Sequence, residues 1–203
     1  MYSQTEQLVK QLDEVGSKSE RLKVLLELVS VYTEQNYLEG WKTANEAVSL
    51  AKVLDDEPSL ANAYQGLATC AWKLADYTMG LEYFVDALDV YTRIDDKYGI
   101  AKCYCGMGII NGSLEEYKTA LEYFEIALEN SEAANRFQLS ATLKGNIGHV
   151  YFNFGQYQKA LGCFEEALAQ SEESGYNGVT ANMLGGIAGV HVYLGDYAKG
   201  LKM

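Results

Sequence analysis

The sequence has a single proline, two histidines and no apolar run of 18 residues. Because proline is the strongest interruption of a helix, a chain that contains only Pro58 leaves room for long helices. The start of the chain, MYSQTEQLVKQLDEVG, has no basic segment followed by an apolar one, which argues against a signal peptide. With no apolar run long enough for a membrane span, these absences predict a cytoplasmic protein with no membrane partner.

Positive charge is also scarce. The chain has 16 Lys and Arg residues against 28 Asp and Glu residues, which gives a formal net charge of −12. A surface this negative repels phosphate backbones and anionic lipids. We therefore expect no nucleic acid and no membrane among the partners.

Constellations for metal binding or catalysis are missing. His149 and His191 lie far apart in the sequence, with no Cys or carboxylate at metal-ligand spacing. No C-x-x-C motif is present, and two helical positions two apart point to different sides, so Cys103 and Cys105 do not chelate together. We expect free, buried or half-buried thiols, no metal, no cofactor and no enzymatic activity in this chain.

What the sequence does contain is a repeat of 40 residues without insertions. A tyrosine recurs at Tyr37, Tyr77, Tyr117, Tyr157 and Tyr197. Three residues later comes a small residue: Gly40, Gly80, Ala120, Ala160 and Gly200. Four residues further lie Ala44, Phe84, Phe124 and Phe164, followed three residues on by Ala47, Ala87, Ala127 and Ala167. A constant period of this kind is typical of stacked repeat proteins.

The residue pattern within each repeat predicts two helices. A lead-in helix over residues 4–15 belongs to an N-terminal capping segment, 1–20, and the array occupies 21–203. We predict that Ser19 caps the first helix of repeat 1, which runs to about Glu34, and that its second helix covers 37–54. The repeats are expected at 21–60, 61–100, 101–140, 141–180 and, incomplete, 181–203. The later first helices are predicted at 58–74, 98–112, 138–154 and 178–194, and the second helices at 77–93, 117–133, 157–173 and from 197.

Short turns are expected within the pairs at 75–76, 115–116, 155–156 and 195–196. Between pairs, we predict helix stops at 55–56 and 95–96, at Asn135 and at Gly175, because Asn and Gly tolerate the left-handed conformation. Small residues let neighbouring helices approach, and the recurring phenylalanine is predicted to be buried between adjacent repeats.

These residues resemble the tetratricopeptide repeat family from about residue 21 onward. The matching positions in the fourth repeat are Gly148, Tyr151, Gly155, Tyr157, Ala160, Phe164 and Ala167. Two departures stand out: the repeat here has 40 residues instead of 34 and lacks a closing proline, and the first repeat has Leu28 and Ala44 where the pattern differs. The resemblance implies an all-α, right-handed superhelical solenoid of antiparallel helix pairs, with about five repeats. It also implies a concave groove, lined by the first helices, that binds peptides or protein segments.

Positions on the first helices spaced 3, 4 and 3 apart would face that groove. In the first repeat this stripe includes Leu22, Leu25 and Val29. The residues that we single out as groove candidates are Tyr32, Asn62, Gln65, Thr69, Trp72, Lys73, Lys102, Ile109, His149, Phe152, Asn153, Asn182 and Tyr193.

None of these candidates is Asp or Glu, and the charges are confined to Lys73, Lys102 and His149. Tyr32 shares its repeat position with two other aromatic candidates, Trp72 and Phe152. The sequence therefore predicts an apolar to mildly acidic peptide in the groove. The alternative is that the aromatic residues pack against neighbouring helices.

The resemblance does not identify the partner. Relatives that clamp a C-terminal carboxylate carry Lys, Arg and Asn at positions held here by Leu26, Val29, Gly66, Thr69 and Gly106. Of the asparagine row with which other relatives hold a peptide backbone, only Asn146 is present.

Two functional contexts stay open. The repeat style is similar to the N-terminal sensory arrays of bacterial signalling proteins, such as those that precede a diguanylate cyclase. The alternative is a structural scaffold that self-associates, as a homodimer through the C-terminal repeat. An apolar face around Tyr193, Tyr197 and Leu201 would favour either that dimer or a natural chain that continues past residue 203.

Overall fold

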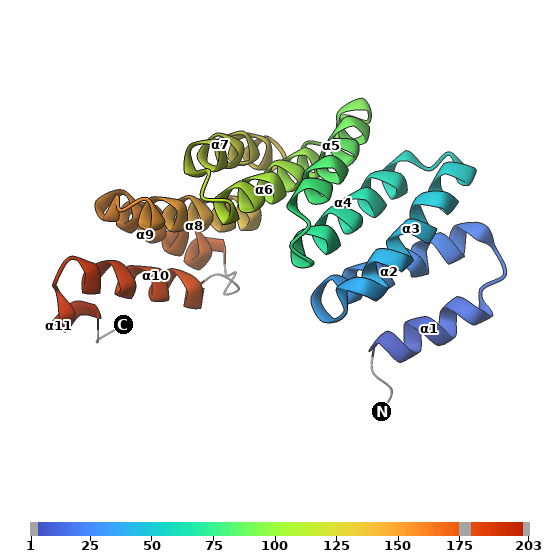
Figure 1. Ribbon diagram of the computed structural model, residues 1–203, viewed down its shortest axis with the longest axis horizontal. Helices are drawn as coiled ribbons and strands as arrows, with labels where there is room; N and C mark the ends of the chain where they lie inside the picture. The colour runs from blue at the N-terminus through green and yellow to red at the C-terminus, as the bar shows by residue number, and fades with distance from the viewer. Residues whose placement is uncertain (1–3, 175–179, 201–203) are drawn as a thin grey trace. The chain divides into compact units, whose positions relative to one another are not determined.

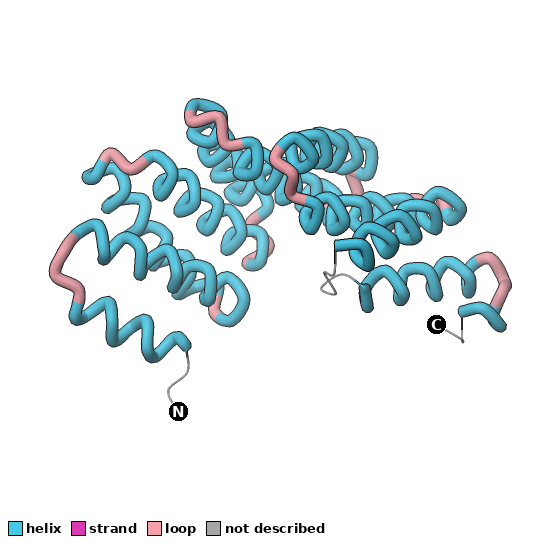
Figure 2. Tube along the Cα trace, turned by 180° about the vertical axis from the view of Figure 1, so that it is seen from behind, coloured by secondary structure: helices cyan, strands magenta, loops and turns pink. Residues whose placement is uncertain are grey.

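The computed structural model describes residues 4–174 and 180–200, and in these residues every regular element is an α-helix (Figure 2). The elements group into two compact units, residues 1–106 and 107–203. In the part of the chain that is described, no helix is both long and apolar enough to cross a membrane.

Unit 1 is built from consecutive helices joined by turns of one to three residues. Its elements are α1 (Gln4–Glu14), α2 (Lys18–Gln35), α3 (Tyr37–Leu54), α4 (Glu57–Lys73), α5 (Tyr77–Arg93) and the first part of α6 (Lys97–Ser113). Each helix from α1 to α4 packs on the next, and α2 also packs on α4 (Figure 1). The first helices of successive pairs are therefore neighbours.

Unit 2 repeats this plan. It contains the end of α6, α7 (Tyr117–Ala133), α8 (Phe137–Asn153), α9 (Tyr157–Ser174), α10 (Thr180–Tyr193) and α11 (Tyr197–Gly200). Consecutive helices from α7 to α11 pack together, and the first helices α8 and α10 are again in contact. The predicted fold class, all-α with antiparallel helix pairs, is confirmed.

Side chains at the helix starts explain where the helices begin. Asn36, Asp56 and Asp76 each accept a hydrogen bond from the backbone N–H three residues later, which satisfies an otherwise unpaired donor. The prediction for α2 was wrong: Ser17, not Ser19, is its cap, and Ser17 Oγ accepts from Glu20 N at 3.2 Å. Both serines precede the same apolar stripe, so local sequence alone does not distinguish between them.

Residues with positive φ end the helices at the predicted places. Asp55, Asp95 and Asn135 adopt φ of 52°, 53° and 55° between pairs, and the predicted stop at Gly175 lies outside the described residues. Within pairs, the same conformation occurs at four equivalent turn positions: Ala75, Glu115, Gly155 and Gly195. Ala75 and Glu115 carry a Cβ in this conformation, which costs about 1–2 kcal/mol.

We therefore expect Ala75→Gly to stabilise unit 1. Relief of the left-handed strain exceeds the extra entropy of glycine in the unfolded chain, for a net gain of about 0.5–1 kcal/mol. Urea denaturation measures the change, and Gly155→Ala at the equivalent turn is the matched control, expected to lose a similar amount. A loss of stability in Ala75→Gly would contradict the strain argument.

The recurring phenylalanines are buried, as predicted: Phe84 is 3% exposed, Phe124 2% and Phe164 0%. Each lies against a glycine of a first helix. A Cβ built on Gly108 would lie 2.6 Å from the Phe124 ring, and one built on Gly106 would lie 2.1 Å from the Phe84 ring. Because real Cβ atoms do not approach this closely, these glycines are what allows the rings to fit between helices.

The first repeat solves the same problem with different residues. Ala44 stands where the later repeats have phenylalanine, and Val29 occupies the space beside Gly66, with Cγ1 2.4 Å from a Cβ built there. Leu22 and Leu25, which the helical stripe placed toward the groove, are only 1% exposed and lie in a core cluster with Ala44. That placement was wrong, because aliphatic side chains of α2 supply the volume that an aromatic ring supplies elsewhere.

Candidate functional site

Among the residues that the structure describes, three surface hollows open along first helices. One, the unit 1 hollow, has a volume of about 270 Å³ and opens between α2 and α4, beside the start of α6. Its lining consists of Leu26, Val29, Ser30, Thr33, Asn62, Gln65, Gly66, Thr69 and Lys102. Four predicted groove residues thus come together: Asn62, Gln65, Thr69 and Lys102.

Tyr91 is a residue of this site that the sequence reasoning missed. It lies on the second helix α5, is only 1% exposed, and its hydroxyl reaches the two amides of α4. The hydroxyl donates to Asn62 Oδ1 at 2.8 Å and shares its proton with Gln65 Oε1 at 3.1 Å. Burial holds the pKa of Tyr91 well above its ordinary value of 10.0, so the hydroxyl stays a donor. The only signal in the sequence is a comparison between repeats. The position of Tyr91 holds a small residue in the other repeats: Ala51, Ser131 and Ser171.

Lys102 lies over aromatic rings at the edge of the unit 1 hollow. Its Nζ atom is 5.7 Å from the ring centroid of Tyr91 and 4.9 Å from that of Tyr98. Both contacts are in the range of cation–π attraction, which keeps the ammonium group at the site.

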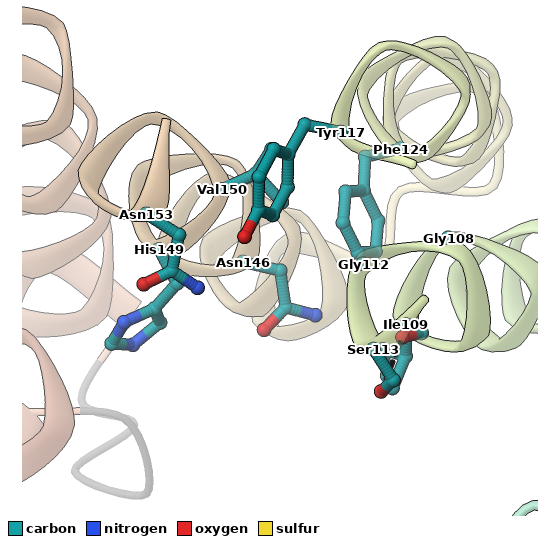
Figure 3. A pocket seen from close by; sticks show the side chains of 10 residues that line it. All are labelled: Gly108, Ile109, Gly112, Ser113, Tyr117, Phe124, Asn146, His149, Val150 and Asn153. Carbon is teal, nitrogen blue, oxygen red and sulfur yellow. Dashed lines mark hydrogen bonds between the residues drawn. The ribbon is translucent and has the colours of Figure 1, made fainter. Parts of the chain in front are cut away.

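The central hollow of unit 2 lies among α6, α7 and α8 and has a volume of about 260 Å³ (Figure 3). Gly108, Ile109, Gly112, Ser113, Tyr117, Phe124, Asn146, His149, Val150 and Asn153 line it. Asn146, His149 and Asn153 project from one side of α8, as helical spacing requires (Figure 3). The structure therefore brings together the predicted residues Ile109, His149 and Asn153.

The terminal hollow of unit 2, about 300 Å³, lies between α8 and α10. It is lined by His149, Phe152, Phe164, Ala181, Asn182, Gly185, Gly186 and Gly189. The Phe152 ring packs edge-on against Tyr157 at 5.6 Å and against Tyr193 at 5.1 Å between ring centroids. Tyr193 also stacks on Tyr157 and remains 64% exposed.

His149 separates the two unit 2 hollows. His149 is exposed as a residue, and its ring packs edge-on against Phe164 at 4.9 Å between centroids. Partial burial, which removes water from around the ring, lowers the pKa of His149 below its ordinary value of 6.5.

We expect His149 to stay neutral at pH values where an ordinary histidine is already protonated. Because the folded pKa lies below the unfolded one, the unfolded chain binds more protons in this window. The contribution of His149 to stability is complete above pH 6.5 and declines as the pH falls toward its lowered pKa. An NMR titration of the ring protons, assigned with His149→Gln, measures the pKa, and a midpoint at or above 6.5 would be the contrary result.

Four predicted residues do not line the hollows: Tyr32, Trp72, Lys73 and Tyr193. Tyr32 packs against the cluster of Leu8, Val24 and Leu28. The Lys73 ammonium lies 4.6 Å from the Trp72 ring centroid. Tyr32 thus has the inter-helix packing that the alternative interpretation describes, and the ligand role of all four stays a prediction.

The side chains that line these hollows can form hydrogen bonds, but none of them is acidic. No Asp or Glu occurs among the described residues that line the three hollows. Within residues 4–174 and 180–200, no three His, Cys, Asp or Glu side chains gather as a metal site. The four cysteines are free, and burial raises the pKa of Cys70 to about 11 and that of Cys103 to about 12, so both remain unreactive thiols.

Comparison with protein families gives one match. The model described as tetratricopeptide repeat covers residues 59–133 and 139–203, more than half of the chain. No curated protein matches the sequence at a significant level.

Solved structures share the fold at low sequence identity. BtubC from P. vanneervenii is 19% identical, with a TM-score of 0.79 over 99% of this chain and 88% of that one. A Rap protein complexed with competence and sporulation factor is 18% identical (TM-score 0.78; 97% and 65% covered). A STAND signal-transduction ATPase with a tetratricopeptide repeat sensor, from Pyrococcus horikoshii, is 15% identical (TM-score 0.78; 98% and 32% covered). The chain thus spans about two thirds of the Rap protein and one third of the ATPase.

Proposed function

Because the chain belongs to the tetratricopeptide repeat family, we propose that it is a non-catalytic scaffold that binds a protein or peptide segment along its first helices. Helix-pair repeats of this kind present extended surfaces for interaction. The observation that carries the proposal is the position of the hollows: all three open along first helices, where the resemblance implies a groove.

The polarity of the hollows supports a peptide as the occupant. Amide side chains such as Asn62, Asn153 and Asn182 offer both donors and acceptors to an extended backbone. The rings and glycines of the terminal hollow leave an apolar slot beside them. The absence of acids from these linings, in a chain of net charge −12, favours an apolar to mildly acidic segment.

The setting that we propose is a regulatory or sensory module of a larger bacterial signalling protein in the cytoplasm, such as a diguanylate cyclase. The support is likeness of fold to a Rap protein complexed with competence and sporulation factor and to an ATPase whose repeats are its sensor. A second candidate is a self-association scaffold without a peptide ligand. The observation that favours it is the exposed surface of Tyr193, Leu194 and Tyr197.

A library of random 12-residue peptides, selected on the immobilised 203-residue protein, tests the proposal. Enriched peptides are expected to bind in calorimetry and to lose affinity in Asn62→Trp or Asn182→Trp, which fill the hollows. Asn45→Trp on the second helix α3 is the matched control and should leave binding intact. If no peptide is enriched and light scattering finds a dimer that Tyr193→Glu dissociates, the scaffold alternative is correct.

A further inference from the structure

The terminal hollow differs from the other two in its walls. Aromatic rings line it from α8 and α9, and α10 contributes three glycines, Gly185, Gly186 and Gly189. We propose that this hollow binds one planar aromatic ring with an N–H or O–H group at its edge, an indole or a phenol. Such a ring is offered by a free small molecule or by a Trp or Tyr side chain of a bound segment.

Two of the glycines are not required by packing within the chain. Gly186 is required, because a Cβ built on it would lie 2.8 Å from the Phe164 ring. In the described part of the chain, no atom lies within 4 Å of a Cβ built on Gly185. A Cβ on Gly189 would meet the Phe152 ring at 3.8 Å, an ordinary contact distance. Since an interior glycine destabilises a helix, these two positions keep space open at a cost to α10.

The other repeats fill the equivalent space. The position of Gly189 carries a larger side chain in each of them: Val29, Thr69, Ile109 and His149. The position of Gly185 is also glycine in the preceding repeat, at Gly145, but there Met183 Cε lies 2.5 Å from a built Cβ. No described side chain does the same at Gly185. The space left there suits an apolar group of a ligand.

The aromatic walls suit a second ring. Phe152 is held by edge-on contacts with Tyr157 and Tyr193, at 5.6 and 5.1 Å between ring centroids. Because its orientation is already fixed, little freedom is lost when another ring packs against it. The hollow has a volume of about 300 Å³, and a protein cavity of about 150 Å³ holds benzene, so a bicyclic indole has room.

Two polar side chains in the lining, His149 and Asn182, match the edge of such a ring. Neither has a hydrogen bond to another residue in the described part of the chain. The lowered pKa keeps His149 uncharged at neutral pH, so one ring nitrogen accepts, and the amide of Asn182 offers an acceptor oxygen. The described lining contains no Asp, Glu, Lys or Arg. A neutral ligand with one donor is therefore favoured over a charged one.

NMR titration of the 203-residue protein with indole and with p-cresol tests the site. The backbone amide signals of Gly185 and Gly189 should shift most. Binding should saturate at about 10 mM or below, the range for ligands of this size. Two probes serve as matched comparisons: 1-methylindole lacks the N–H of indole, and 4-methylcyclohexanol is the saturated form of p-cresol. Each should bind about threefold to tenfold more weakly than its partner.

The variant Gly185→Leu fills the open space and should weaken indole binding by about tenfold or more. The helix should stay intact, because leucine is a good helix former and its Cβ meets no described atom within 4 Å. Gly162→Leu, on α9, is the matched control, since a Cβ built there also has no described neighbour within 4 Å. It should change affinity less than about twofold. Circular dichroism of both variants reports whether the helices are formed.

The hydrogen bond is tested separately with His149→Phe, which keeps a ring beside Phe164, and with Asn182→Leu. The preference for indole over 1-methylindole should fall below about twofold in the variant that removes the accepting atom. Competition then identifies the source of the ring. A library peptide with Trp or Tyr that displaces indole makes the ligand a side chain, whereas a peptide that binds beside indole makes it a free small molecule.

Four results overturn the site. These are shifts not centred on α8 and α10, equal binding of indole by Gly185→Leu, equal affinity for p-cresol and its saturated form, and an indole preference that survives both His149→Phe and Asn182→Leu. None of them involves a peptide, so the proposed function stands or falls by its own selection experiment. If the library enriches nothing while indole binds as described, the proposed function fails and the aromatic site remains.

Discussion

Replacing Phe164 with alanine should lower the free energy of unfolding by about 3–5 kcal/mol. The ring is 0% exposed and lies between α8 and α10, where Cβ atoms built on Gly148 and Gly186 would come within 2.7 and 2.8 Å of it. Neither glycine has a side chain that can move into the space, so a cavity stays open and its lining loses dispersion contacts.

Urea denaturation with an unchanged m-value is the measurement for Phe164→Ala. Phe154→Ala is the matched control, because this side chain is 44% exposed and its loss should cost far less. Amide hydrogen exchange in α8 and α10 should rise together in Phe164→Ala, since both helices lose the same ring. A change below about 1 kcal/mol would mean that the helices close over the gap.

The substitution Gly148→Ala should cost about 1–3 kcal/mol, although alanine is the better helix former. The added Cβ would lie 2.7 Å from Cε1 and 2.8 Å from Cδ1 of the Phe164 ring. The ring also lies against Gly186 of α10, where a built Cβ would be 2.8 Å from Cε2 and Cζ, so α10 limits its movement away from Gly148. The penalty is therefore one of overpacking.

Gly162→Ala is the opposite case. Gly162 lies within α9 with nothing inside 4 Å of a Cβ built on it, so the same substitution should stabilise by about 0.5–1 kcal/mol. A double-mutant cycle of Gly148→Ala with Phe164→Leu isolates the contact, because the smaller side chain makes room for the methyl group. If Gly148→Ala stabilises as Gly162→Ala does, the ring is not confined as described.

Much of the candidate site follows from helical spacing, and one part does not. The stripe along the first helices placed Asn62, Gln65 and Lys102 on one face, and the structure brings them into one hollow. Tyr91 escaped the same reasoning because it lies on α5, 26 and 29 residues from its two hydrogen-bond partners. Whether a side chain on one helix reaches a neighbouring helix depends on how the two helices pack. The spacing of residues within one helix does not predict this.

The sequence by itself determined the number of residues in each repeat, the helix pairs and most of the turns. These depend on local properties: the periodic apolar residues, capping side chains such as Asp56, and residues such as Asn135 that tolerate positive φ.

Only the tertiary structure decided which side chains of a stripe are core and which are exposed. Leu25 is buried because Ala44 leaves a space that α2 must fill, whereas Thr69 reaches the surface of a hollow. Whether a side chain is buried depends on the volumes of the side chains that two or three packed helices contribute to the same space. The same packing determines where a ligand has room to bind.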